Sequence, residues 1–372
     1  MVNPETLVKI YRKIDSRKTK AVAVNAMRVF GLRHMVIRMD TINLCNLRCK
    51  MCYYSSDYMR KKDEMSEATF RKIAEEVFPR TRFLYLSCAT EPLTNKNFAK
   101  LLRITGEYNV PFTSFCTNGQ LLTREVVQAA IDANISEVIF SIDGATAETY
   151  EHIRRGGKWN TLLEKLELFN SVKAQSGAKN PLLRMNFTCM QRNINELPAM
   201  VNFAADHGVH SLHVRHLLAY SDKENSVAGE MEYVTVFNSI AAESRQAAVS
   251  RGINLFLPDA VPEGRPSMAT KTCLTDGSQV SRRAEANSYC MLPWFQAIIS
   301  WQGEYRVCTA QRLGNLNEQS FDEIYNGEKM REIRRRMLWR TENSCSWNCC
   351  EEAYDVPGQM AASDSQPVAR AQ

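Results

Sequence analysis

Three cysteines that lie close together in the sequence constrain this chain more than any other feature. Cys45, Cys49 and Cys52 are separated by three and then two residues. The preceding residues 35–41 alternate apolar with polar side chains, which predicts a strand that ends at the cysteines. Thiolates suit zinc or iron–sulfur clusters, and four protein ligands normally close either site. The next histidine in the sequence, His152, is too far along the chain to be a fourth ligand within this loop. Three thiolates therefore predict a metal site with one open position.

This run resembles the signature of the radical S-adenosylmethionine (SAM) enzymes. The resemblance implies that Cys45, Cys49 and Cys52 hold a 4Fe–4S cluster whose unique iron is chelated by SAM. It further implies reductive cleavage of SAM to methionine and a 5'-deoxyadenosyl radical that abstracts a substrate hydrogen, with a flavodoxin- or ferredoxin-type electron donor. The residue before the last cysteine is commonly aromatic in the family, so Met51 or the following Tyr53 is expected to contact the adenine. A partial zinc site and buried structural cysteines are the alternatives.

Composition is that of an ordinary globular protein. The chain has 372 residues, 44% of them hydrophobic and 24% charged, which fits one barrel-sized domain with a smaller appendage. A formal net charge of +6 permits an anionic substrate but is too small for a nucleic-acid-binding surface. The sequence shows neither a signal peptide nor an integral membrane segment, and its 12 cysteines favour metal ligation in the cytoplasm over disulfides.

Strand-like and helix-like segments alternate from residue 35 to about residue 218. This pattern predicts a parallel sheet with its active site at the carboxyl ends of the strands. Six strand–helix units fit a partial (β/α)6 TIM-like barrel of the α/β class, as the resemblance also implies. The strands are expected at residues 35–41, 83–87, 112–116, 137–142, 182–189 and 211–215. Helices are expected near residues 96–108, 124–134 and 158–174.

The second predicted strand ends in the residues Ser-Cys-Ala-Thr-Glu-Pro, at positions 87–92. In the family this place is taken by a Gly-Gly-Glu-Pro run that binds the amino group of SAM. Ala89 and Thr90 stand where the glycines would be, but Glu91 keeps the carboxylate that an ammonium group needs. The alternative for Glu91 is an acid that caps a helix at a turn.

Polar residues also end the third and fourth strands. Asn118 precedes Gly119, and Ser141 and Asp143 precede Gly144. Each motif alone is an ordinary turn pair. The resemblance implies that Asn118, Ser141 and Asp143 line the SAM site. Arg154 or the neighbouring Arg155 is a candidate clamp for the SAM carboxylate, and a surface pair at a helix start is the alternative.

Three polar residues on the last two strands are candidates to face the barrel interior. These are Asn186 on the fifth strand and His213 with Arg215 on the sixth. Side chains along a strand alternate between its two faces, so an outward orientation is an equal alternative for each.

A second group of cysteines lies near the C-terminus: Cys290, Cys308, Cys345, Cys349 and Cys350. A predicted strand begins with the run Cys290-Met-Leu-Pro-Trp-Phe, and a predicted hairpin at Trp301-Gln-Gly-Glu brings the first two cysteines together. The region resembles the auxiliary-cluster domain of SPASM and twitch radical SAM enzymes, which implies a second 4Fe–4S cluster held by four of these thiolates. One of the last two would then be free, and a zinc site is the alternative. Cys273 is a weak candidate hydrogen donor.

The sequence therefore divides into five predicted parts. They are an N-terminal helical arm (1–34), a radical SAM partial barrel (35–221), a helix with a connecting segment (222–289), an auxiliary-cluster domain (290–356) and a disordered tail (357–372).

The expected function is oxidation or other modification of a small molecule, such as a sugar or aminocyclitol, with the auxiliary cluster as electron acceptor. A short N-terminal arm favours a small substrate over a peptide. The alternatives are a maturase of a ribosomally made peptide and a non-catalytic iron–sulfur or zinc scaffold.

Overall fold

A single curved sheet forms the framework of the protein. The computed structural model describes residues 17–52, 62–217, 231–258, 292–307 and 312–339. The strands are β1 (Met35–Met39), β2 (Thr81–Leu86), β3 (Phe112–Thr117), β4 (Glu137–Ser141), β5 (Leu182–Cys189), β6 (Ser211–His216), β7 (Asn254–Phe256), β8 (Gln296–Ile299), β9 (Glu304–Arg306) and β10 (Arg312–Asn315). Their order across the sheet is β10-β9-β8-β1-β2-β3-β4-β5-β6-β7.

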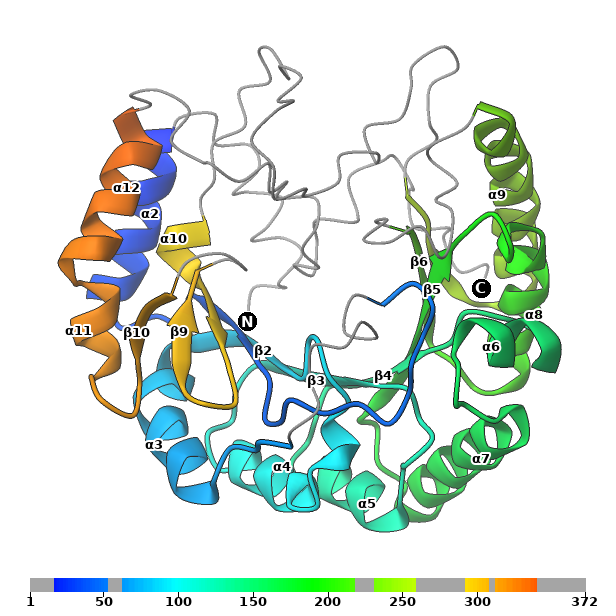
Figure 1. The fold of residues 1–372 in the computed structure, drawn as a ribbon, viewed down its shortest axis with the longest axis horizontal. Helices are drawn as coiled ribbons and strands as arrows, with labels where there is room; N and C mark the ends of the chain where they lie inside the picture. The colour runs from blue at the N-terminus through cyan, green and yellow to red at the C-terminus, as the bar shows by residue number, and fades with distance from the viewer. Residues whose placement is uncertain (1–16, 53–61, 218–230, 259–291, 308–311, 340–372) are drawn as a thin grey trace.

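Helices cover the outer face of this sheet, which bends into an open horseshoe (Figure 1). They are α2 (Arg17–Val29), α3 (Glu67–Val77), α4 (Phe98–Gly106), α5 (Arg124–Asp132), α6 (Ala147–Ile153), α7 (Trp159–Ser176), α8 (Leu197–Asp206), α9 (Met231–Arg251), α10 (Leu292–Phe295), α11 (Phe321–Tyr325) and α12 (Glu328–Trp339). None of the helices in the described residues is long and apolar enough to cross a membrane.

The outward side chains of the strands supply the main core. Ile37, Leu84, Phe115, Phe140 and Met185 are each at most 1% exposed and belong to one cluster with the buried faces of the helices. Because side chains alternate along a strand, the intervening positions face the inside of the horseshoe. Helix starts are fixed by local capping, as where the side chains of Ser66 and Thr123 accept a hydrogen bond from backbone N–H groups of α3 and α5.

The predicted six-stranded parallel barrel is confirmed, and the structure adds parallel strands at both ends. β7 pairs with β6, and β8 pairs with β1. The chain from Leu292 to Phe295, which was expected to begin a strand, forms the short helix α10 instead. Pro293 explains the difference, because proline is well tolerated in the first turn of a helix and lacks the N–H that a central strand needs.

The predicted hairpin is confirmed as well, since β9 returns antiparallel to β8. β10 then pairs antiparallel with β9, so these C-terminal strands continue the barrel sheet. The turn requires Gly303, whose φ is +77° and whose Cβ position would lie 2.9 Å from Asn315 Oδ1. The predicted boundaries near residues 221, 289 and 356, and the tail, fall outside the described residues.

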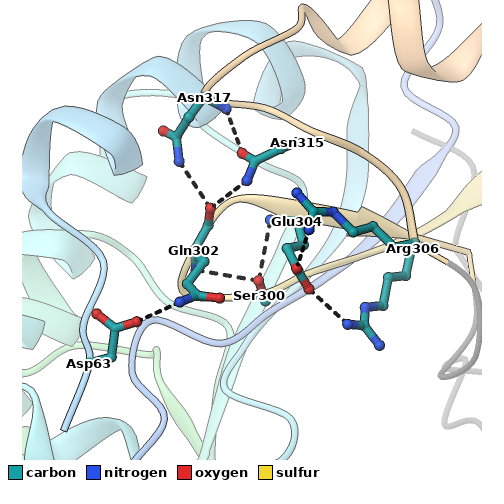
Figure 2. A network of polar contacts seen from close by, with 8 residues as sticks. Asp63, Ser300, Gln302, Glu304, Arg306, Asn315 and Asn317 are labelled. Carbon is teal, nitrogen blue, oxygen red and sulfur yellow. Dashed lines mark hydrogen bonds and ion pairs between the residues drawn. The ribbon is translucent and has the colours of Figure 1, made fainter.

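Asp63 joins this C-terminal hairpin to the segment that follows β1. Its Oδ2 accepts a hydrogen bond from Trp301 Nε1 at 3.0 Å. The same oxygen accepts one from Gln302 Nε2 at 2.8 Å (Figure 2). Its backbone N–H donates to Asn43 Oδ1 at 2.8 Å, and its carbonyl accepts from the Asn43 N–H at 3.0 Å. The carbonyl of Gln302 accepts from the Asn315 and Asn317 side chains, which stiffen the turn. One carboxylate therefore ties the hairpin to the loop that carries the three cysteines.

Candidate active site

The loop with the three cysteines leaves the carboxyl end of β1 and crosses the inside of the horseshoe (Figure 1). Backbone hydrogen bonds attach this loop to the segments that follow β2 and α6. The carbonyl of Leu44 accepts the Glu91 N–H at 3.0 Å, beyond the end of β2. Further along, the N–H groups of Arg48 and Lys50 donate to the carbonyls of Arg155 and Ile153, at 2.8 and 2.9 Å. These backbone bonds fix the loop over the carboxyl ends of the central strands.

The thiols of this loop have the chemistry of a cluster site. Cys49 is 7% exposed, and burial raises the pKa of its thiol to about 12 against the opposing effect of the Arg154 charge. Burial also raises the pKa of Cys45, and the charges of Cys45 and Cys52 lie close enough to raise the pKa of Cys49 further. Ligation by iron therefore has to displace protons from these thiols.

In the part of the chain that the structure describes, no three His, Cys, Asp or Glu side chains converge tightly enough to enclose one metal ion. The thiolates of a 4Fe–4S cluster each bind a different iron, so they do not converge on one point. A three-cysteine loop that is held by backbone bonds fits that donor set.

Glu91 lies at the centre of the site. It is 2% exposed, and its Oε2 accepts the Asn118 N–H at 2.7 Å while its Oε1 accepts the Thr117 hydroxyl at 2.7 Å and the Leu93 N–H at 3.2 Å. Burial raises the pKa of Glu91 to about 7, although these hydrogen bonds oppose the shift. The contact with Leu93 also caps the short 3-10 helix Pro92–Thr94, so Glu91 does act as a cap, in addition to lying in the site.

Asp40 holds the turn that precedes Glu91, a role that the sequence analysis missed. Its Oδ1 accepts the N–H groups of Cys88 and Ala89, at 2.9 and 3.1 Å, and lies within 3.4 Å of the N–H of Thr90. Ser87 begins this turn with a φ of +75°, a conformation that is uncommon for residues other than glycine. An acid directly after a buried strand was the available signal. The Asp40 carboxylate thus stabilises a turn in which Ala89 and Thr90 stand in place of two glycines.

Asn118 connects β3 to the cysteine loop. Its side-chain Nδ2 donates to Asn46 Oδ1 at 2.8 Å and lies 4.0 Å from Cys45 Sγ. Its Oδ1 accepts the Gln120 N–H at 3.0 Å, which fixes the orientation of the amide. Asn118 therefore links two parts of the site, because its backbone N–H binds Glu91 and its side chain lies beside Cys45.

Asp143 and Arg154 form a buried ion pair beside Cys49. Asp143 Oδ2 lies 2.7 Å from Arg154 Nη2, with the two side chains 0% and 10% exposed. Asp143 Oδ1 also accepts the Thr188 N–H at 2.7 Å. Arg154 Nη1 is 4.0 Å from Cys49 Sγ. The alternative of a surface pair is therefore wrong for Arg154, whereas Arg155 is exposed.

Two further candidates lie on the edge of this group. Ser141 is half-buried, and its Oγ is 3.1 Å from Cys116 Sγ on the neighbouring strand. Met51 packs against Ile153, Met190 and Leu217 in a small apolar cluster. Tyr53 lies outside the described residues, as do Cys273 and all five auxiliary cysteines, namely Cys290, Cys308, Cys345, Cys349 and Cys350.

The inner face of the barrel carries the remaining polar residues. Asn186 and His213 are paired in register, and the His213 ring packs at a tilt against Phe256 with ring centroids 4.2 Å apart. Asn186 accepts from Arg184 Nε at 3.1 Å. Arg184, like Arg38 on β1, was not singled out from the sequence, although an arginine inside an otherwise apolar strand was a visible signal.

Comparison with known proteins adds family and fold. Residues 39–177 match the model of the radical SAM superfamily, and residues 290–350 match an iron–sulfur cluster-binding domain, SPASM. The chain is 22% identical over 338 residues to the tungsten-containing aldehyde ferredoxin oxidoreductase cofactor-modifying protein of Pyrococcus furiosus, covering 83% of this chain and 86% of that one. It is 27% identical over 314 residues to the AdoMet-dependent heme synthase of Methanosarcina barkeri, covering 78% and 82%.

Among solved structures, SuiB of Streptococcus suis bound to S-adenosylmethionine superimposes with a TM-score of 0.61 at 14% identity, over 85% of this chain and 72% of that one. This likeness shows the shared partial-barrel fold. A radical SAM domain binds a 4Fe–4S cluster and SAM, and a SPASM domain binds further iron–sulfur clusters. The cysteine loop, the barrel and both family matches agree, and this chain belongs to the radical SAM superfamily, in the subgroup with a C-terminal SPASM-type auxiliary-cluster domain.

Proposed function

We propose that this protein is a radical SAM oxidoreductase that removes a hydrogen atom from a small-molecule substrate. When bound, the cluster and SAM supply a 5'-deoxyadenosyl radical, which is the chemistry that amino-acid side chains cannot provide. The observation that carries the proposal is the meeting of Glu91, Asn118 and the Asp143–Arg154 pair, from three different strand ends, around the cysteine loop.

Glu91 is suited to bind the ammonium group of SAM. Its carboxylate is already oriented by Thr117 and Asn118, so binding a cation costs little further ordering. A buried carboxylate that meets an ammonium group forms a charge-assisted hydrogen bond, which is among the stronger kinds in proteins.

Arg154 has a different role in the proposal. Burial would lower the pKa of this guanidinium, but Asp143, Cys49, Tyr150 and Cys116 together outweigh that effect and raise it. The fixed positive charge beside Cys49 favours the thiolate over the thiol. Arg154 is thus a positioning residue for the cluster, and Asp143 with Ser141 lies where the sugar or methionine part of SAM is expected.

The auxiliary region completes the proposed electron path. Cys290, Cys308, Cys345 and either Cys349 or Cys350 are proposed to hold a second 4Fe–4S cluster, which accepts the electron left on the substrate after hydrogen abstraction. A flavodoxin- or ferredoxin-type protein is the proposed donor for the first cluster. The 12 cysteines make the reducing cytoplasm the proposed place of action.

The relatives that cover most of the chain support a small substrate. Their names describe a cofactor-modifying protein and a heme synthase, and the chain spans more than four fifths of each. A ribosomally made peptide is the second candidate, because SuiB was also solved with its precursor peptide SuiA and superimposes with a TM-score of 0.58. At 15% identity, that likeness shows a shared fold alone.

Anaerobic reconstitution tests the proposal. The reconstituted protein is incubated with SAM, dithionite and deuterated candidate substrates, and 5'-deoxyadenosine is examined by mass spectrometry. Deuterium in 5'-deoxyadenosine from a small molecule is the expected result. Transfer from a precursor peptide alone would establish the second candidate. Absence of both 5'-deoxyadenosine and methionine would leave a non-catalytic iron–sulfur scaffold.

A further inference from the structure

Three arginines project from different strands onto the inner face of the barrel. Arg38 lies on β1, Arg184 on β5 and Arg215 on β6. The core-facing neighbours of each are buried against the helices, for example Ile37, Met185 and Val214. The alternation of a strand therefore turns the three guanidinium groups inward. Four strands lie between β1 and β6 in the sheet, so only the curvature of the horseshoe brings their side chains together.

The three guanidinium groups act on one another. Burial lowers the pKa of Arg215, and the positive charges of Arg184 and then Arg38 lower it further. Arginine nevertheless stays charged in proteins, so the three guanidinium groups repel one another in the folded protein. Glu137 lies 3.7 Å from Arg184, and Arg38 stacks over Tyr85 at 5.0 Å from the ring centroid. Three positive charges thus lie on the inner face of the barrel, where Glu137 is paired with Arg184.

Polar atoms on the same face have no hydrogen-bond partner among the described residues. They are Tyr85 Oη, Ser114 Oγ, Ser211 Oγ and His213 Nδ1. Tyr85 and Ser114 are 6% and 1% exposed and are neighbours in the register of β2 and β3. A buried polar group without a partner costs about 1–3 kcal/mol, so four of them on one face indicate a missing ligand.

This cluster adjoins the SAM site. Cys116 lies close enough to Glu91 and Arg154 on one side, and to Arg184 on the other, for their charges to affect the pKa of its thiol. Its Sγ is also 3.1 Å from Ser141 Oγ. A molecule held by the arginines would therefore lie next to the position proposed for SAM.

We propose that Arg38, Arg184 and Arg215, with the hydroxyl of Tyr85, bind an oxyanion group of the substrate, a carboxylate or a phosphate, inside the barrel. This inference rests on the proposed function, because it names the chemical class of the small-molecule substrate. Planar guanidinium groups match both oxyanions with paired N–H donors. The Tyr85 and Ser114 hydroxyls can donate to the remaining oxygens, which removes the cost of their missing partners.

Calorimetric titration of the anaerobic, SAM-loaded holoenzyme tests the inference, with succinate and inorganic phosphate as the probes. Wild-type protein is expected to bind at least one of them, more weakly at high salt. Arg215→Gln is expected to weaken that binding by about tenfold or more, and Arg215→Lys by less. Preference between the two probes distinguishes a carboxylate from a phosphate substrate. The matched control is Arg103→Gln on the surface of α4, which removes the same charge outside the barrel.

Tyr85→Phe separates ligand binding from a structural role. The Tyr85 hydroxyl makes no hydrogen bond with the described residues, so its removal is expected to leave the unfolding midpoint unchanged or raise it. Anion affinity is nevertheless expected to fall by about threefold to tenfold. This variant also tests the site if Arg215→Gln does not fold, which circular dichroism and iron content reveal.

Two results would overturn the inference. One is wild-type protein that binds neither probe at millimolar concentration. The other is equal affinity in wild type, Tyr85→Phe and whichever Arg215 variants fold. Binding of a probe by protein that makes no 5'-deoxyadenosine would refute the radical proposal and keep the anion site. Formation of 5'-deoxyadenosine without anion binding would do the reverse.

Discussion

The guanidinium of Arg154 lies 2.7 Å from the carboxylate of Asp143, and its other nitrogen lies 4.0 Å from Cys49 Sγ. Asp143 follows β4 and Arg154 follows α6, so the pair joins the floor of the barrel to the cysteine loop. The arginine is charged and buried because the acid compensates it, and the thiol next to it experiences that charge. This relationship links the stability of the barrel to the chemistry of the cluster.

Arg154→Gln is expected to lower the free energy of unfolding by about 3 kcal/mol or more, because it leaves the Asp143 carboxylate buried without its cation. Urea unfolding of the metal-free protein measures this. Arg155→Gln, one residue away and exposed, is the control and is expected to change stability by less than about 0.5 kcal/mol. Equal effects of the two substitutions would contradict a buried ion pair.

SAM binding is expected to depend on pH through Glu91, whose pKa is raised to about 7 by burial. The carboxylate is protonated below that pH and ionised above it, so affinity for the SAM ammonium group should rise between pH 6 and pH 8. Glu91→Gln should weaken SAM binding by about tenfold or more at pH 8 and remove this pH dependence. Titration of reconstituted protein with SAM at several pH values is the measurement.

Glu91 also gives a stability prediction of known sign. Its pKa is higher in the folded protein than the ordinary value of 4.5, so folding favours the protonated form. Its contribution to stability is present below about pH 4.5 and is lost as the pH rises through about 7. Glu91→Gln, which is neutral throughout, should flatten this part of the stability curve of the metal-free protein. An unchanged curve would show that Glu91 titrates near its ordinary pKa.

Cys49→Ser is expected to remove about four irons per chain, since a cluster that loses one of three thiolates is not retained. Iron analysis and the visible spectrum after anaerobic reconstitution measure the loss. Cys88→Ser is the matched control, because Cys88 is exposed and is no candidate ligand. Equal iron content in the two variants would rule out the cysteine loop as a cluster site.

Asp63→Ala is expected to loosen the C-terminal hairpin, because Trp301 and Gln302 lose a shared acceptor. Two hydrogen bonds to a carboxylate correspond to about 3 kcal/mol or more of local stability. Hydrogen–deuterium exchange of β8 and β9 should accelerate, while exchange in β4 and β5 stays unchanged. Asp132→Asn on the surface of α5 is the control. If β8 and β9 exchange as slowly as in wild type, Asp63 does not hold them.

Local sequence pattern was sufficient for much of the framework. The predicted helix from Lys158 to about Ala174 is observed at Trp159–Ser176, and the predicted strand Leu182–Cys189 has those bounds. Both follow from the periodicity of their apolar residues, which acts within a few residues. Periodicity did not separate α10 from a strand, since a four-residue apolar helix and a short strand have similar composition.

The sequence by itself determined the family chemistry, because the three thiolates that define it lie within one loop of eight residues, from Cys45 to Cys52. Tertiary structure decided which partners surround them. Asp143 meets Arg154, and Asp63 meets Trp301 across 238 residues of chain, only because parallel strands end on one edge of the sheet and β8 returns beside β1. Arg38, Arg184 and Arg215 come together for the same reason, since curvature of the sheet is a property of the packed barrel and of no single strand.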